Sequence, residues 1–350
     1  MVSRVTLAFL LMLWTLGCWS SYPKPGVVRG ADLVQKSPFF ESAEIGEVQS
    51  ITIAPPASGV DYNVIVAGTT AAAFVTRSGE LRRLVRFESK RSTPVPIDVE
   101  GDGTLEFMDR GGGWQPVALI NADGRTAWQY EGELKGLEAP NEMDAGDLDG
   151  DGRLEFVIGM NGAGGVLCRD DRGATRWTAA GMNVFSVAVL DANADGRLEV
   201  VHSNIPRIEV RDAAGALLKT MQPGFGSFAT VAWPDARGAR RLMGEANGQL
   251  QIVDFEGKVL ARFDATGLWG QSPATVVRLA PDRPYFAVGS TIKATMQLSR
   301  LKIFEPGMAP LYEEVFGSAH LPVAALGDDT TGRERLLVGS GSQVWSLQLR

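Results

Sequence analysis

Apolar residues along this chain fall in short runs separated by polar turns, and the arrangement repeats. Each repeat has an apolar strand, an acidic or polar loop, and a second strand ending in a small or polar residue. The loops begin near Pro55, Asp98, Asp147, Asp191, Asp235, Asp282 and Asp328. From Asp98 onward, successive loops start 44–49 residues apart. A regular period of this length indicates a repeat architecture.

Each repeat holds four predicted strands. The strands after the loops cover residues 63–68, 105–110, 154–159, 198–203, 241–246, 285–290 and 335–340. A second strand pair follows in most copies across a glycine turn, at Gly79, Gly124, Gly173, Gly215, Gly257 and Gly307. Residues that alternate around such a turn are typical of a β-hairpin. We therefore predict an all-β protein, a seven-bladed β-propeller with four-stranded blades.

The last repeat ends at Arg350 after three strands, so the ring needs a fourth from elsewhere. An open sheet edge is an aggregation risk, which favours closure by the N-terminal segment between residues 27 and 45. Within it, residues 30–34 have the most strand-like pattern. The predicted propeller domain is 30–350.

Residues 1–17 are predicted to be an export signal. Arg4 precedes an apolar run from Val5 to Gly17 that is too short for a comfortable membrane span. Gly17 before Cys18 resembles the cleavage site of bacterial lipoproteins, which implies lipidation of Cys18, a tether over 18–29, and an outer-membrane or cell-surface location. Plain secretion and an uncleaved anchor are the alternatives.

Composition excludes several classes of protein. The chain is 45% hydrophobic and 21% charged, as folded globular proteins are, and its net charge of −7 does not favour nucleic-acid binding. With Cys18 lipidated, Cys168 is left without a disulfide partner. Cys168 lies in an apolar run, so we expect it to be a buried small hydrophobic residue. We expect a monomer that contacts membrane only through its lipid.

Three of the seven loops carry closely spaced oxygen ligands. Positions 1, 3, 5 and 9 are Asp98, Glu100, Asp102 and Glu106; Asp147, Asp149, Asp151 and Glu155; and Asp191, Asn193, Asp195 and Glu199. Glycine at position 6 permits a sharp turn, and the backbone carbonyl at position 7 (Thr104, Arg153, Arg197) would add a ligand. Such a shell suits Ca²⁺ better than Mg²⁺. An EF-hand would close at position 12 between helices, and simple Asp-Gly turns would not recur in phase with the repeat.

This strand–loop–strand pattern resembles the FG-GAP/VCBS repeats of integrin α-subunit propellers and of many bacterial exported proteins. The resemblance covers about residues 46–350 and implies about three Ca²⁺ sites on the side chains just named. The second hairpins, followed by Trp128 or Trp177, also resemble quinoprotein-like repeats. That group includes noncatalytic scaffold lipoproteins of outer-membrane protein assembly.

No catalytic constellation stands out in the sequence. The two histidines, His202 and His320, are expected at turns or the rim, and neither a nucleophile elbow nor a phosphate loop is present. We therefore expect a binding or scaffold module for a protein or glycan. The alternative is a propeller hydrolase or lyase acting on an extracellular polysaccharide or phosphoester.

The expected binding face is the one opposite the acidic loops. It is built from the links between blades and from the loops between second and third strands. Its candidate partner-binding residues are Trp114, Asn141, Asn161, Asn183, Asn204, Trp269, Gln271 and His320. The asparagines at 161, 204 and 247 recur at intervals of 43 and have an alternative interpretation as turn formers.

Overall fold

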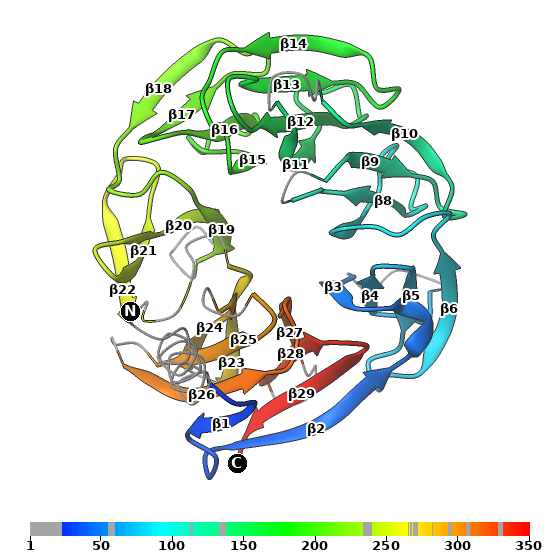
Figure 1. Ribbon diagram of the computed structural model, residues 1–350, viewed down its shortest axis with the longest axis vertical. Coiled ribbons are helices and arrows are strands. Elements are labelled where there is room, and N and C mark those ends of the chain that lie inside the picture. The colour runs from blue at the N-terminus through cyan, green and yellow to red at the C-terminus, as the bar shows by residue number, and fades with distance from the viewer. Residues whose placement is uncertain are drawn as a thin grey trace, which may run out of the picture.

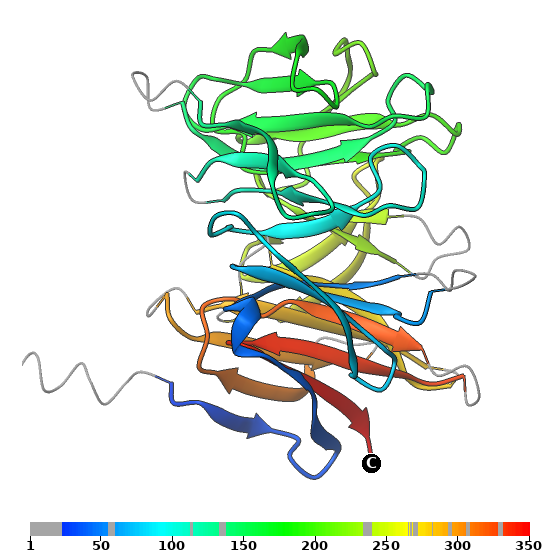
Figure 2. The same cartoon turned by 90° about the vertical axis from the view of Figure 1, so that its right-hand side faces the viewer.

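The chain forms a closed ring of seven antiparallel sheets (Figure 1). The computed structural model describes residues 23–350 except 55–59, 113–114, 133–137, 234–239, 265, 267, 269–271, 282, 293–295, 306–308 and 328–331. The sheets lie around the axis as blades (Figure 1), and seen from the side their strands run between the two faces of the ring (Figure 2). The predicted all-β, seven-bladed propeller is confirmed. Within the described ranges, no helix is long and apolar enough to cross a membrane.

The first four blades follow the chain without interruption. Blade one contains β3 (Val48–Ile53), β4 (Val64–Gly68), β5 (Ala71–Val75) and β6 (Leu81–Arg86). Blade two contains β7 (Pro94–Ile97), β8 (Glu106–Asp109), β9 (Val117–Ile120) and β10 (Thr126–Tyr130). Blade three contains β11 (Pro140–Gly146), β12 (Glu155–Met160), β13 (Val166–Arg169) and β14 (Thr175–Ala179). Blade four contains β15 (Val187–Leu190), β16 (Glu199–Asn204), β17 (Arg207–Arg211) and β18 (Leu217–Met221).

The remaining blades combine C-terminal and N-terminal strands. Blade five contains β19 (Ala229–Ala232), β20 (Arg240–Ala246), β21 (Gln249–Val253) and β22 (Val259–Asp264). Blade six contains β23 (Ala274–Ala280), β24 (Arg283–Thr291), β25 (Ser299–Phe304) and β26 (Pro310–Phe316), with β1 (Gly26–Arg29) as a fifth strand. Blade seven contains β27 (Val323–Gly327), β28 (Glu334–Ser340), β29 (Gln343–Leu349) and β2 (Val34–Glu41).

A strand from the predicted segment 27–45 closes the ring as expected, but the residues chosen within it, 30–34, were wrong. Residues 30–33 form a turn in which the Leu33 N–H donates to the Gly30 carbonyl at 3.0 Å. Gly30 has φ +75°, a left-handed conformation that breaks a strand. The closing strand is β2, which pairs with β29 from Val34 to Glu41. Gly26–Arg29, expected in the tether, pair with β26 as β1.

A short 3₁₀ helix, η1 (Ala43–Ile45), leads from β2 into blade one. The Ser42 hydroxyl caps it by accepting the Glu44 N–H at 3.3 Å, and Ile45 is fully buried. This turn carries the chain from the outer strand of blade seven to the inner strand of blade one.

The core lies between neighbouring blades, where the second strands are almost wholly buried. Every residue of β4 and of β12 is buried, as expected for sheets covered on both faces. One cluster joins Met108 of blade two to Phe156 of blade three. Cys168 is fully buried, as predicted, and burial raises the pKa of its thiol to about 12.

Outer-strand tryptophans connect one blade to the next. Trp128 Nε1 donates to the Asp171 carbonyl at 3.1 Å, and Trp177 Nε1 donates to the Ala213 carbonyl at 2.9 Å. Each indole packs on a hairpin glycine of the next blade, where a Cβ would lie 3.2 Å (Gly173) or 2.8 Å (Gly215) from the ring. Both glycines have positive φ, so the turn and the blade contact each require glycine.

Candidate functional site

The three acidic loops join first to second strands in blades two, three and four. In each, the aspartate at position 1 accepts backbone N–H groups from positions 5 and 6. For Asp98 these bonds are 3.1 and 2.9 Å, for Asp147 3.1 and 3.0 Å, and for Asp191 3.1 and 2.9 Å. The glutamate at position 9 accepts the N–H of position 2 at 2.8–3.2 Å. The sequence repeat is therefore a structural repeat, with the carboxylates held by the backbone.

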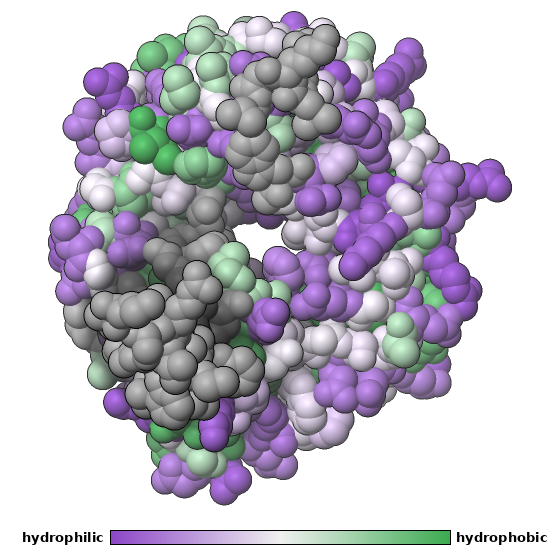
Figure 3. All heavy atoms as spheres, viewed as in Figure 1, coloured by the Kyte–Doolittle hydropathy of each residue, from purple (hydrophilic) through white to green (hydrophobic). Residues whose placement is uncertain are grey.

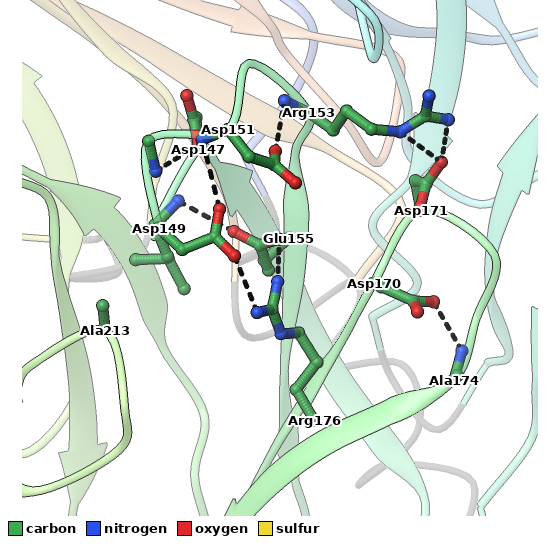
Figure 4. Close-up of polar contacts among 12 residues, drawn as sticks. Asp147, Asp149, Asp151, Arg153, Glu155, Asp170, Asp171, Ala174, Arg176 and Ala213 are labelled. Carbon is green, nitrogen blue, oxygen red and sulfur yellow. Dashed lines mark hydrogen bonds and ion pairs between the residues drawn. The ribbon is translucent and has the colours of Figure 1, made fainter.

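The middle loop gathers its carboxylates most tightly. Oxygens of Asp147, Asp149 and Asp151 lie within 4.8 Å of one another. Glu155 on β12 lies beside them (Figure 4). Three carboxylates this close could supply part of the six to eight oxygen ligands that a Ca²⁺ ion takes.

A guanidinium also lies at the middle loop. Arg176 on β14 donates through Nη1 to Glu155 Oε1 at 2.6 Å, and its Nη2 pairs with Asp149 Oδ2 at 2.7 Å (Figure 4). Alanine and leucine, at 127 and 218, occupy the matching sequence positions in blades two and four. Arg176 therefore supplies positive charge where a cation would bind.

The loops of blades two and four arrange their position-3 side chains differently. Glu100 pairs with Arg153 of the next loop at 2.9 Å. Asn193 Nδ2 donates to Asp195 and to Glu199, both at 3.1 Å. The backbone cradle is the same in all three loops, but the middle loop has its position-3 carboxylate turned toward positions 1 and 5. The loops at Asp235, Asp282 and Asp328, where no metal is expected, begin outside the described residues.

Protonation equilibria differ within each loop. Backbone N–H groups at Thr104 and Arg197 lower the pKa of Asp102 and Asp195, and the Arg176 guanidinium lowers that of Asp149. Partial burial raises the pKa of Glu106, Glu155 and Glu199, although each accepts a backbone N–H that acts in the opposite direction. At these position-9 glutamates, a bound cation would therefore offset the largest electrostatic cost of keeping a carboxylate ionised.

On the opposite face, the candidate asparagines divide into two groups. Asn183 Oδ1 accepts the Gly162 N–H at 3.0 Å, and Asn204 Oδ1 accepts the Met182 N–H at 3.1 Å. Asn161 is 7% exposed. Asn183 and Asn204 thus hold backbone N–H groups through their side chains, and Asn161 is buried. Cys18, Trp114, Trp269 and Gln271 lie outside the described residues.

Asn141 and His320, by contrast, line a hollow on the ring axis. Two adjoining cavities of about 350 and 260 Å³ share a wall formed by Gln49, Thr93, Arg110, Glu142, Ser272, Pro273 and Pro322. We call them together the axial hollow; Figure 3 shows an opening at the centre of the ring. The larger cavity falls within the range of small-ligand sites, about 300–1,000 Å³, and the smaller lies just below it. No local pattern in the sequence points to Gln49, Arg110 or Glu142, because they converge only when the ring closes.

An ion pair crosses the wall of the axial hollow. Arg110 Nη2 donates to Glu142 Oε1 at 2.5 Å, and Arg110 Nε donates to the Met143 carbonyl at 2.9 Å. Burial inside the ring raises the pKa of Glu142 to about 7, while Arg110 and the Val187 N–H act to lower it. A quarter of the Glu142 side chain still faces the hollow.

The expectation for His202 was wrong. It is fully buried in blade four, where Arg211 Nε donates to Nε2 at 2.9 Å and Nδ1 lies 3.0 Å from the Ser203 carbonyl. Burial lowers its pKa, so the ring is neutral and accepts from Arg211. The available signal was the position of His202 directly after Val200 and Val201 in a second strand, since second strands are almost wholly buried.

Comparisons with known proteins show the fold alone. Neither the family models nor the curated proteins searched gave a match. Among solved structures, a streptogramin B lyase is similar with a TM-score of 0.56 at 9% identity, covering 92% of this chain and 99% of that one. A catalytically inactive histidine-to-alanine variant of virginiamycin B lyase from Staphylococcus aureus, with quinupristin, gives 0.56 at 11% identity (91% and 100% covered). BBS1N in complex with ARL6DN gives 0.52 at 11% (93% and 97% covered).

Proposed function

We propose that this protein is an exported, lipid-anchored, Ca²⁺-stabilised propeller that binds a protein or glycan partner on the face opposite its acidic loops. The observation that carries the proposal is the axial hollow, which polar side chains from several blades line at that face. Asn141 and His320 are the described partner-binding candidates that reach it.

Ca²⁺ would have a structural role. Asp147, Asp149, Asp151 and Glu155 would hold one ion, and the matching residues of the 98–106 and 191–199 loops would hold two more. Three Ca²⁺ would change the formal net charge from −7 to about −1. Bound cations would relieve repulsion among the carboxylates and rigidify that face.

Site-specific crosslinking tests which face binds. A photoreactive residue placed at His320, and for comparison at Arg197 on an acidic loop, is expected to capture a partner from membranes only at position 320. Arg197 is a matched control because its side chain is 84% exposed. Capture from position 197 alone would move the binding site to the acidic-loop face and overturn the assignment.

The anchor has its own test. Several acyl chains attach a protein stably to a membrane, whereas one chain does so only marginally. Cys18→Ser is therefore expected to release the protein from the membrane fraction or leave its precursor uncleaved. If the wild-type protein is wholly soluble outside the cytoplasm, the lipid-anchor proposal is wrong and simple secretion takes its place.

The second candidate is a polysaccharide or phosphoester hydrolase or lyase. Glu142 and His320 line the same cavity, and a carboxyl with a pKa of about 7 suits general acid–base chemistry. Release of new reducing ends from extracellular polysaccharides, lost in Glu142→Gln, would favour this candidate. Binding without turnover in the same assay would exclude it.

A further inference from the structure

Two innermost strands each carry an extra residue at the same end of the axial hollow. Pairing of β3 with β4 skips from Val48 to Ser50, and pairing of β11 with β12 skips from Pro140 to Glu142. Gln49 and Asn141 are the inserted residues, and both line the axial hollow. Bulges of this kind re-aim side chains and are common beside binding sites.

Gln49 has an unusual hydrogen-bond state. The residue is 8% exposed, and its Nε2 donates to the Glu47 carbonyl at 3.4 Å. Its Oε1 is buried and has no hydrogen-bond partner in the described part of the chain. A buried amide oxygen without a donor is destabilising, so this position favours a bound O–H or N–H group.

The charges that line the larger cavity balance. Among its lining residues, Arg110 and Glu142 are charged, and they pair with each other. Arg240 lines the smaller cavity, where it is exposed and donates to Thr230 Oγ1 at 2.5 Å. A guanidinium paired with a carboxylate does not select a strongly charged ligand in the larger cavity, because either sign would meet a like charge.

The remaining lining combines hydroxyl groups with small apolar surfaces. Thr93, Ser272 and Thr291 contribute hydroxyl-bearing side chains, and Pro273 and Pro322 contribute apolar rings. A sugar matches this lining because each hydroxyl both donates and accepts while the ring C–H groups pack on apolar surface. A peptide would present fewer groups able to do both.

We propose that the axial hollow binds one unit of a neutral glycan, with Gln49 Oε1 accepting a sugar hydroxyl and the Arg110–Glu142 pair holding neighbouring hydroxyls. The inference rests on the proposed function, since it names the partner class for the same face. It assigns Gln49 and Asn141 as the specificity residues.

Titration with defined sugars tests this inference. Methyl glycosides of glucose, galactose, mannose and N-acetylglucosamine are compared with glucuronate, glucosamine and short peptides by calorimetry on the full-length protein. We expect at least one neutral glycoside to bind with Kd of about 1 mM or tighter, and charged sugars about tenfold more weakly. Preference for glucuronate, glucosamine or peptide, or a hollow that takes up water only, would overturn it.

Gln49→Met separates a binding role from a structural one. Methionine keeps the length of the side chain and removes the unpaired acceptor, so glycoside affinity should fall about tenfold while Tm stays equal or rises. Met182→Ala is the control, because Met182 is 51% exposed and does not line the axial hollow. Unchanged affinity in Gln49→Met would overturn the assignment of Gln49.

The two proposals fail in different ways. If no neutral glycoside binds but the residue at position 320 still crosslinks a partner, the binding face stands and the glycan assignment is wrong. If neither occurs, both proposals are wrong.

Discussion

Blades two to four and blades five and six have the same strand order but are stabilised differently. In blades two to four, carboxylates at 98, 147 and 191 hold each first loop through backbone N–H groups. In blades five and six, aromatic rings pack together. The ring centroid of Phe263 lies 4.6 Å from that of Phe286, on which it stacks, and 5.0 Å from that of Phe304. Trp233 meets Phe286 edge-on at 5.9 Å.

The difference shows that blades with the same strand order can rely on different interactions. Carboxylate cradles concentrate negative charge and so depend on counter-ions and pH. Aromatic clusters depend on apolar burial and are insensitive to both. Blades two to four, called the acidic half below, should therefore respond to ionic conditions. Blades five and six, called the aromatic half, should not.

The largest expected effect of a single substitution comes from the aromatic half. Phe286→Ala removes a ring that is 3% exposed and contacts three other aromatics, so unfolding free energy should fall by about 3–5 kcal/mol. The loss should be equal with Ca²⁺ or chelator in a urea titration. Leu218→Ala, at a side chain 55% exposed, should change stability by less than about 0.5 kcal/mol. A Ca²⁺-dependent loss in Phe286→Ala would contradict the contrast.

Calcium should act on the acidic half. At a hundredfold excess over Kd, each site would add about 2.7 kcal/mol, which a higher Tm with Ca²⁺ than with chelator would report. Asp149→Ala should remove the part of this Ca²⁺-dependent stabilisation that the middle loop contributes. Glu256→Ala, at an acidic side chain 82% exposed in blade five, should keep the full effect. An unchanged Tm, together with no Ca²⁺ retained after dialysis, would contradict the proposal that the acidic loops bind Ca²⁺.

Acid should also weaken the acidic half through His202. Burial lowers its pKa below the ordinary 6.5, so the unfolded chain binds the proton more readily. The stabilisation is complete above about pH 6.5 and is lost as pH falls through the folded-state pKa, at about 1.4 kcal/mol per pKa unit. Urea unfolding across this range should show a slope that His202→Gln reduces. An identical slope in the variant would exclude His202 as the cause.

The smallest expected effect concerns Arg176. With chelator present, Arg176→Gln should cost about 0.5 kcal/mol, since its side chain is 38% exposed and such pairs are weak. With Ca²⁺, the middle loop should bind more tightly because a competing cation is gone. Calorimetric titration measures this, and Arg283→Gln is the control because Arg283, 58% exposed, pairs with Glu305 in blade six, away from the acidic loops. Weaker Ca²⁺ binding in Arg176→Gln would mean that the guanidinium supports the site.

Local pattern was enough to predict much of this protein. Alternation and the 44–49-residue period predicted seven four-stranded blades, and the Asp-Gly spacing predicted three equivalent loops. The hairpin turns at Gly79, Gly124, Gly173, Gly215 and Gly257 follow the same logic. These features depend on hydrogen bonds between residues a few positions apart, so the sequence alone determines them.

Contacts between distant residues were decided only by the closed ring. β2 closes the last blade by pairing Val34 with Leu349. Because polar residues follow Val34, the sequence pattern of this strand did not identify it as the closing strand. Gln49, Arg110 and Glu142 come from three different blades, and their meeting at the axis depends on where closure places each inner strand. His202 is buried because β16 is covered on both faces. Pairing and convergence over such separations leave no local periodicity, since the chain meets itself there only after it has folded.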